Sequence, residues 1–473
     1  RRYGGLSLTH LAHLTPLSVS FLNHALRSGM VRLRLRAHFT RAAKLPLAVP
    51  LRSFSRAAPP AAVSCEPLVR TMVSAQSQSL AHQLPLARHY SATGGGLEEE
   101  LQTAAQREQT SVTLKATLDT GLGLLLPESS SSEMTRRQRT LIQIAQFLRR
   151  ELPVRLARRV VELKSLPGGL DEVSSVQRVR DWYQHSFVEI RRSAPVVCAQ
   201  SEGDFCRLLE GIYERHAPTL VTMAHGVHEL KRRLESEHGK GFDFGAKTDI
   251  HDFLDRFYMS RIGIRILIGQ YLELHREPQA EGYVGLINRH TSPAEIAEQA
   301  IYDAAYLCER THGDAPEVKI YGRSDGNFTY IPSHLYYCLF ELIKNSLRAV
   351  TEHHGADNAL PPIKVIIADS ESNEDVVIKV SDEGGGIPRS HMPRIFSYLF
   401  TTATPAFGGN DAFSSAGDHG TDSPLAGLGY GLPISRTYAR YFGGDLNIMS
   451  MEGYGTDAFL HLSRLGNRAE PLP

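Results

Sequence analysis

Four short polar or glycine-rich segments near the C-terminus constrain the fold of this chain more than any other feature. Each is too short to form a domain, but together they supply carboxylate, amide and hydroxyl groups next to glycines whose bare backbone can approach a phosphate. Their order and spacing fit one nucleotide site assembled from separate parts of a single domain. The segments are Glu341–Arg348, Ser381–Pro388, Gly427–Pro433 and Gly453–Asp457.

The first segment is expected on a helix, because its residues separate into two faces at about 100° per residue. One face is polar and the other is apolar, so one side can pack while the other is available for chemistry. The polar stripe consists of Glu341, Lys344, Asn345 and Arg348, and the opposite face of Leu339, Leu342, Ile343 and Leu347.

Two residues of the polar stripe are candidates for direct roles in phosphoryl transfer. The amide oxygen of Asn345 suits Mg²⁺, which prefers hard oxygen ligands and keeps several of its waters. Glu341, one turn earlier, can orient or deprotonate a substrate hydroxyl. The alternative is an ordinary helix surface with an Arg–Glu salt bridge.

The remaining segments supply an adenine acceptor and a phosphate cradle. Asp382 ends a β-branched run and precedes three glycines, so its carboxylate can accept from the exocyclic amine of adenine, although an Asx turn is the alternative. Gly427, Gly429 and Gly431 lead directly into an expected helix, whose N-terminus attracts phosphate. No Walker P-loop signature is present.

This order of segments resembles the N, G1, G2 and G3 boxes of the ATPase and kinase superfamily that includes Hsp90, DNA gyrase, MutL and the sensor histidine kinases. Within that superfamily, the chain resembles the mitochondrial protein kinases of the 2-oxoacid dehydrogenase complexes, and more closely the pyruvate dehydrogenase kinases of plant type. The resemblance covers roughly residue 134 to the C-terminus. It is carried by Leu254–Arg265, Glu341–Ala349, Asp382–Pro388, Tyr398–Ala403, Gly429–Tyr441 and Ser450–Asp457.

The resemblance implies roles for individual residues. Glu341 is implied as the catalytic base with His216 as its partner, Asn345 as the Mg²⁺ ligand, and Tyr183, Ser186, Arg261 and Arg265 as an effector pocket. Tyr213 stands where related kinases place an arginine near that pocket. The implied ATP-binding residues are Glu341, Leu342, Ile343, Lys344, Asn345, Ser346, Leu347, Arg348, Asp382, Gly384, Gly386, Thr401, Thr402, Gly427, Leu428, Gly429, Tyr430, Gly431, Leu432 and Thr456.

The resemblance also implies a function: an ATP-dependent protein serine kinase of the mitochondrial matrix that phosphorylates the E1α subunit of pyruvate dehydrogenase and inactivates the complex. Such kinases dock on the lipoyl domain of E2 and form homodimers through the ATP-domain sheet. Most kinases of the pyruvate type have a serine where this chain has Thr401. This difference favours one alternative function, that of a branched-chain 2-oxoacid dehydrogenase kinase. A protein histidine kinase and an ATP-driven clamp ATPase are alternatives of another class.

Periodicity predicts the architecture as α+β. Amphipathic helices over Thr135–Arg150, Val176–Arg191, Asp204–Leu234 and Asp249–Glu273 predict a four-helix bundle at 134–290. From 291 to 473 the pattern becomes mixed, and the resemblance makes this part an α/β sandwich of the Bergerat type that binds ATP. The long segment Ser397–Ala426 is expected to form a lid over the nucleotide.

The N-terminal part differs from the rest in composition. Residues 1–65 contain ten Arg or Lys and no Asp or Glu, whereas the remainder contains 42 basic against 51 acidic residues. Residues 1–60 are therefore expected to be a mitochondrial transit peptide, and 61–133 a low-complexity linker. The acidic balance of the remainder does not favour nucleic-acid binding. The apolar stretches of the N-terminal part are too interrupted to span a membrane.

Overall fold

The structure, a computed structural model, describes residues 94–126, 134–239, 242–355, 358–370, 373–402 and 427–472. The expected transit peptide at 1–60 lies outside the described residues. The expected lid is described only as far as Thr402. None of the helices in the described ranges is both long and apolar enough to span a membrane.

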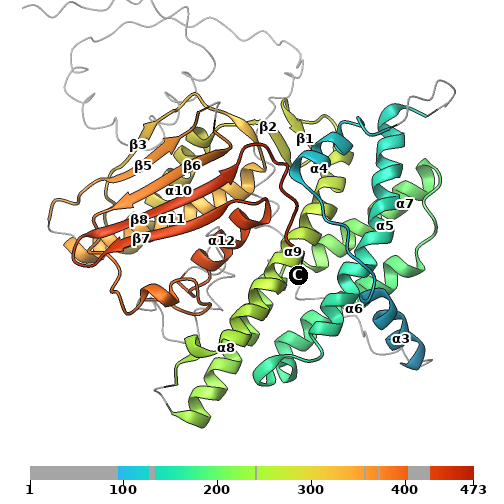
Figure 1. Cartoon of the computed structure of the whole chain (residues 1–473), viewed down its shortest axis with the longest axis horizontal. Helices are drawn as coiled ribbons and strands as arrows, with labels where there is room; N and C mark the ends of the chain where they lie inside the picture. The colour runs from blue at the N-terminus through green and yellow to red at the C-terminus, as the bar shows by residue number, and fades with distance from the viewer. Residues whose placement is uncertain are drawn as a thin grey trace, which may run out of the picture. The chain divides into compact units, whose positions relative to one another are not determined.

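A helical domain comes first, followed by a mixed α/β domain (Figure 1). This order confirms the expected α+β architecture. The helical domain consists of α3 (Gly94–Ala105), α4 (Leu114–Gly121), α5 (Arg136–Glu162), α6 (Ser174–Arg192), α7 (Ala199–Arg215), α8 (Thr219–His238) and α9 (Thr248–His275), with short 3-10 turns η3 (Pro167–Glu172) and η4 (Phe244–Ala246).

Two expected helix boundaries in this domain were wrong. α5 continues through Pro153, because the proline ring is buried beside Leu152 and Leu156, and this packing offsets one lost backbone hydrogen bond. The single helix expected over Asp204–Leu234 is two helices, α7 and α8, because Pro218 disfavours a helical conformation at the preceding residue.

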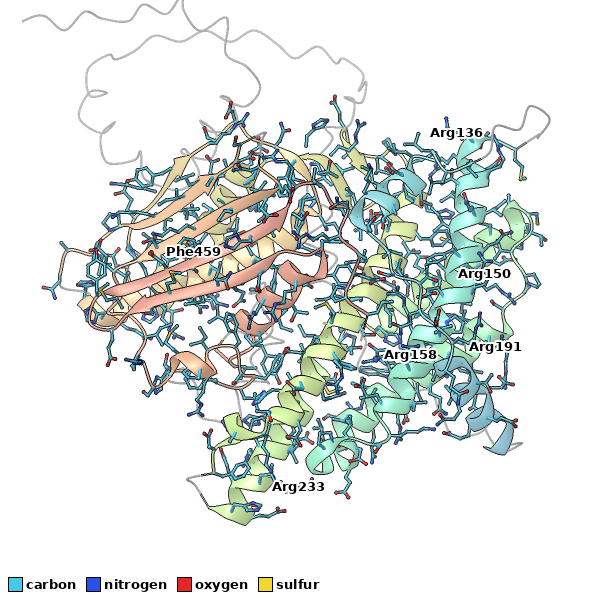
Figure 2. All side chains as sticks on the ribbon, in the orientation of Figure 1. Arg136, Arg150, Arg158, Arg191, Arg233 and Phe459 are labelled. Carbon is cyan, nitrogen blue, oxygen red and sulfur yellow. The ribbon has the colours of Figure 1, made fainter. Side chains whose placement is uncertain are left out.

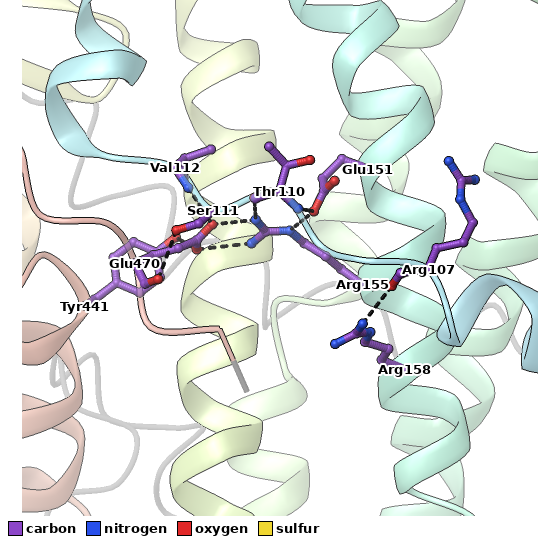
Figure 3. A network of polar contacts seen from close by, with 9 residues as sticks. All are labelled: Arg107, Thr110, Ser111, Val112, Glu151, Arg155, Arg158, Tyr441 and Glu470. Carbon is purple, nitrogen blue, oxygen red and sulfur yellow. Dashed lines mark hydrogen bonds and ion pairs between the residues drawn. The ribbon is translucent and has the colours of Figure 1, made fainter.

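The segment expected as a linker over 61–133 also differs from expectation in its described part. α3 and α4 both pack on α5, and each buries a leucine: Leu101 of α3 lies in the core of the helical domain, and Leu114 of α4 lies in the core that includes the α/β domain. Between them, Ser111 and Val112 hydrogen-bond to Glu470, near the C-terminal end of the chain (Figure 3). Residues 94–126 are therefore part of the fold rather than a linker.

The α/β domain contains one sheet of five strands in the order β3-β5-β6-β8-β7. β3 and β5 are parallel and the other pairs are antiparallel. A separate three-stranded sheet joins β1, β2 and β4. The strands are β1 (Tyr283–Val284), β2 (Ile287–Thr291), β3 (Val318–Gly322), β4 (Phe328–Tyr330), β5 (Ile363–Ala368), β6 (Asp375–Asp382), β7 (Asp445–Met451) and β8 (Gly455–Ser463).

Helices α10 (Pro293–His312), α11 (Pro332–His354) and α12 (Gly431–Tyr441) pack with this sheet. The buried positions alternate along β6, where Val376, Ile378 and Val380 face α11 and form a core with its Leu339 and Ile343. The same alternation brings the ends of β6 and β8 beside the middle of α11. The candidate site therefore lies where strand ends and helix faces meet.

Candidate functional site

Glu341 lies on α11, facing the start of α12. Its side chain is only 3% exposed, and Lys344 Nζ lies 2.7 Å from its Oε1. A Cβ placed on Gly431, the first residue of α12, would overlap Oε2 of Glu341. A buried carboxylate against a helix N-terminus is not an ordinary surface salt bridge, so the simpler interpretation of this stripe does not describe the fold.

Asp382 ends β6 and is buried, with both of its carboxylate oxygens already oriented. Ser346 Oγ of α11 donates to Oδ2 at 2.8 Å, while the backbone N–H groups of Gly384 and Thr456 donate to Oδ1 at 3.0 and 3.3 Å. Burial raises the pKa of Asp382, and these hydrogen bonds oppose that rise. The Asx-type contact to Gly384 therefore coexists with an oriented acceptor.

Glycines around these carboxylates allow backbone segments to lie in contact. Gly386 and Gly429 have positive φ angles of 72° and 74°, and a Cβ on either would overlap a backbone carbonyl oxygen, that of Met451 or Phe400 respectively. Gly427 has a φ of 77°, and a Cβ there would meet none of the described residues within 4 Å. The glycines therefore let backbone segments lie in direct contact near Glu341 and Asp382.

Ser450 begins one of the runs that carry the resemblance, but the sequence assigned its side chain no role in the site. Its Oγ accepts from the N–H of Ile387 at 2.7 Å and lies 2.9 Å from Oγ1 of Thr456, its cross-strand partner on β8. This links the glycine loop after β6 to the β7–β8 hairpin. The pairing of Ser450 with Thr456 across two strands is the signal that could have identified it.

Several implied ATP-binding residues have their side chains in the core. Leu342, Ile343 and Leu347 are at most 3% exposed in the core of the α/β domain, and Tyr430 is buried among other tyrosines. These side chains shape α11 and the glycine loop rather than facing a ligand. Thr401 and Thr402 are exposed, and Arg348 Nη2 lies 3.4 Å from Thr402 Oγ1.

The implied effector-pocket residues do come together in the helical domain. Ser186 Oγ lies 2.9 Å from His216 Nε2, and the rings of Tyr183 and His216 meet edge to face at 4.6 Å. Burial, followed by the charges of Arg215, Arg261 and Arg265, lowers the pKa of His216 to about 3. His216 is thus neutral and lies among the pocket residues. Its implied pairing with Glu341 remains a prediction.

Two arginines on α9, Arg261 buried and Arg265 half-buried, give this pocket its charge. Arg261 is 9% exposed, and its Nε has no hydrogen-bond partner among the described residues. The guanidinium of Arg265 stacks 3.9 Å above the ring of Tyr213. Burying cations without matching carboxylates is costly, so the pocket favours an anion.

The residues present also fit the expected Mg²⁺-nucleotide. In the described ranges, no group of three or more His, Cys, Asp or Glu side chains could hold a metal ion alone. Asn345 offers one partly exposed amide oxygen, which fits an ion bound mainly by phosphate oxygens and water. Gly427, Gly429 and Gly431 place backbone N–H groups at and just before the start of α12, next to Glu341, and such a helix N-terminus fits the phosphates.

Comparison with known proteins gave consistent matches over both domains. Residues 125–288 match a family model described as mitochondrial branched-chain alpha-ketoacid dehydrogenase kinase, and 330–465 match one described as histidine kinase-, DNA gyrase B-, and HSP90-like ATPase. The chain is 49% identical to an Arabidopsis thaliana protein over 75% of its own length and 93% of that protein. A Schizosaccharomyces pombe protein is 36% identical over 81% and 100% of the two chains. Both relatives are named mitochondrial pyruvate dehydrogenase (acetyl-transferring) kinase.

Proposed function

The chain belongs to the family of mitochondrial pyruvate dehydrogenase (acetyl-transferring) kinases, and from this membership we propose that it transfers phosphate from ATP to a serine of the E1α subunit of pyruvate dehydrogenase. Phosphorylation at E1α would inactivate the complex in the mitochondrial matrix. The single observation that carries the proposal is the buried carboxylate of Glu341 held against the glycine start of α12.

In the proposed mechanism, Glu341 accepts the proton of the substrate serine as the hydroxyl attacks. Lys344 Nζ, 2.7 Å from Oε1, pairs with the carboxylate and fixes its orientation. The exposed N–H groups at the start of α12 stabilise the negative charge on the phosphates. Asp382 fixes the adenine end, because its carboxylate is held by Ser346 and two backbone amides.

Asn345 would contribute one ligand to Mg²⁺. When bound, the ion would neutralise negative charge on the phosphates. The protein's own contribution is to place the amide one turn after Glu341 on the same face of α11. The two groups therefore act on opposite reactants, one on the nucleotide and one on the serine hydroxyl.

A cavity in the helical domain supports one proposed partner, the lipoyl domain of E2. A cavity of about 910 Å³ lies between α4, the start of α5 and the end of α9, lined by apolar residues such as Leu122, Leu141 and Leu274 with Arg136 and Arg137 at its polar part. An apolar slot of this kind fits the thioalkyl arm of a lipoyl-lysine, so we propose it for docking of the E2 lipoyl domain. Figure 2 labels Arg136 at this end of α5.

The sheet face opposite the helices is the proposed homodimer surface. Phe459, labelled in Figure 2, lies on this face by the alternation of β8, in which Ala458 and Leu460 are buried toward the helices. Met449 and Met451 on the edge strand β7 are 66% and 67% exposed. Exposed apolar residues on an edge strand favour association.

The pocket around Arg261 is the proposed effector site, with an anionic ligand contacting Tyr183, Ser186, Arg261 and Arg265. Tyr213 stacks on Arg265 and occupies part of the space beside it. We therefore expect a weaker response to pyruvate than an arginine at 213 would give. Measuring inhibition of the wild type and of Tyr213→Arg by pyruvate tests this expectation.

Phosphorylation of purified E1 from the pyruvate and the branched-chain complexes tests the substrate. The branched-chain alternative is favoured by Thr401 and by the description of the family model over the helical domain, whereas the relatives named above are pyruvate-type kinases. We expect acid-stable phosphoserine on pyruvate-type E1. Acid-labile phosphohistidine would indicate a histidine kinase, and release of free phosphate alone would indicate a clamp ATPase.

A further inference from the structure

Leu399 adopts a strained backbone conformation at the junction of the two domains. Its φ is 61°, and it is the one non-glycine residue with positive φ in the described part of the chain. A side chain rarely adopts this conformation, and such strain persists only where the surroundings impose it. The residues on either side of Leu399 show what imposes it.

Tyr398, immediately before the strained residue, is bound to helix α9 of the helical domain. Its side chain is 1% exposed, and its hydroxyl donates a hydrogen bond to Oδ1 of Asp255 at 2.7 Å. Its backbone N–H lies 3.3 Å from Nδ1 of His251, whose ring stacks on the tyrosine ring. Tyr398 therefore belongs to the core of the helical domain, although its chain neighbours belong to the nucleotide site.

Phe400, immediately after the strained residue, lies against Gly429, one of the glycines before α12. A Cβ on Gly429 would overlap the carbonyl oxygen of Phe400, so the two backbones are in direct contact. The Phe400 ring is covered by the guanidinium of Arg394, whose Nη2 lies 2.6 Å from Asp243 in the loop before α9. Both neighbours of Leu399 are thus fixed from opposite sides.

A continuous set of contacts joins these residues to the candidate base. The rings of Tyr398 and Tyr430 lie 5.4 Å apart, and Tyr430 is the residue before Gly431, which contacts the Glu341 carboxylate. Any movement of Tyr398 relative to α9 would therefore displace the glycine loop on which Glu341 rests. Misplacement of about 1 Å at such a site can cost roughly 10²-fold in rate.

We propose that Tyr398 is a positioning residue of the phosphoryl-transfer reaction: by its hydrogen bond to Asp255, it holds the Phe400 backbone against Gly429 and so fixes the glycine loop beside Glu341. The inference rests on the proposed kinase function. It also makes α9 the element through which the helical domain acts on the nucleotide site, because α9 carries Arg261 of the proposed effector pocket as well as Asp255.

Two substitutions remove the hydrogen bond from either side. Tyr398→Phe removes only the hydroxyl, and Asp255→Ala removes the acceptor at an exposed position, where folding is least affected. Asp255→Asn keeps an acceptor oxygen and should restore function. The matched control is Tyr271→Phe, because Tyr271 is also a buried tyrosine whose hydroxyl donates to a carboxylate, that of Glu202, without contacting the glycine loop.

The experiment measures single-turnover phosphoryl transfer to E1 and amide exchange at 400 and 427–431 in the full chain. We expect Tyr398→Phe and Asp255→Ala each to slow transfer roughly tenfold, the double variant to slow it no further, and exchange in these segments to be faster. Asp255→Asn and Tyr271→Phe should match the wild type in transfer rate. Wild-type transfer and exchange in both Tyr398→Phe and Asp255→Ala, or additive effects in the double variant, would overturn the inference.

A failure of the proposed kinase function gives a different result. The wild type itself would then transfer no phosphate to E1, while amide exchange in the variants would still decide whether Tyr398 fixes the glycine loop. If Tyr398→Phe does not fold, the comparison of Asp255→Ala with Asp255→Asn decides the same question. Unchanged exchange in Asp255→Ala would overturn the inference in that case.

Discussion

Gly431 and Glu341 are in contact through the bare Cα of the glycine and the carboxylate oxygen Oε2 of the glutamate. The contact places a helix N-terminus directly beside a buried acid. Two features that lie 90 residues apart in the sequence thus form one chemical unit. The rate of phosphoryl transfer should therefore depend on the identity of residue 431 as well as on Glu341.

We expect Gly431→Ala to slow phosphoryl transfer by at least tenfold, because the added methyl group would push the Glu341 side chain out of place. Gly211→Ala is the control, since Gly211 is helical, its Cβ would meet nothing within 4 Å, and alanine favours helix. Transfer rates and thermal unfolding of both variants check this prediction. An active Gly431→Ala variant would show that the contact with Glu341 is not needed.

The buried pair of Arg155 and Glu470 should be among the strongest contributors to stability (Figure 3). The two side chains are 3% and 2% exposed, and Glu470 also accepts from the Tyr441 hydroxyl. Glu470→Ala leaves the buried Arg155 with Glu151 as its remaining carboxylate partner and deprives the Tyr441 hydroxyl of this acceptor, so it should cost about 3–5 kcal/mol. Denaturant unfolding measures the loss.

The control for that pair is the exposed pair of Arg207 and Asp204, in which the side chains are 69% and 57% exposed. Solvent screens such a pair, and Asp204→Ala should change stability by at most about 1 kcal/mol. Equal losses for Asp204→Ala and Glu470→Ala would show that burial of the Arg155 pair adds nothing.

Truncation should separate the ordered from the dispensable N-terminal residues. A chain beginning at Gly94 should fold and remain active. A chain beginning at Met134 should unfold at a lower temperature, because it lacks Leu101, Leu114 and the backbone contacts to Glu470. The expected dispensability of residues 1–60 is unaffected. Equal melting temperatures for the two truncated chains would contradict the packing of α3 and α4.

Stability should also fall at alkaline pH through His275. Hydrogen bonds to Cys206 and Glu202 raise the pKa of His275 to about 9, against about 6.5 in an unfolded chain. The folded state binds this proton more tightly, so the stabilisation is complete below pH 6.5 and is lost as the pH rises through 9. The difference in unfolding free energy between the wild type and His275→Gln should shrink over that interval. A difference independent of pH would contradict the pairing.

The sequence was most informative where one residue pattern has one physical meaning. The polar stripe on Glu341–Arg348, the strand that ends at Asp382 and the glycines before α12 all appear in the structure as expected, because helix and strand periods fix which side chains share a face. The order of the helical and α/β domains was also predicted correctly, because the hydrophobic periodicity changes from helical to mixed along the sequence.

Long-range contacts explain what the sequence did not reveal. α3 and α4 are short, and they are held by packing on α5 and by the contacts of the residues between them with Glu470, more than 350 residues away. Ser450 and Tyr398 lie in runs that carry the resemblance, but the sequence assigned no role to either side chain, because their contacts with Thr456 and Asp255 depend on strand register and domain packing. The boundary between α7 and α8 was missed because the helical periodicity of the sequence continues on both sides of Pro218.

The assignment of separate roles on α11 and β6 is tested most directly by nucleotide affinity and single-turnover rate in Glu341→Gln, Asn345→Ala and Asp382→Asn. We expect Glu341→Gln to bind Mg²⁺-ATP nearly as the wild type does and to slow phosphoryl transfer by roughly 10²- to 10⁴-fold. Asn345→Ala should weaken binding of the Mg²⁺-nucleotide, and Asp382→Asn should weaken binding with or without the metal. If Glu341→Gln lost ATP binding as severely as Asn345→Ala, Glu341 would serve the metal rather than the substrate proton, and His216 would be the next candidate for the base.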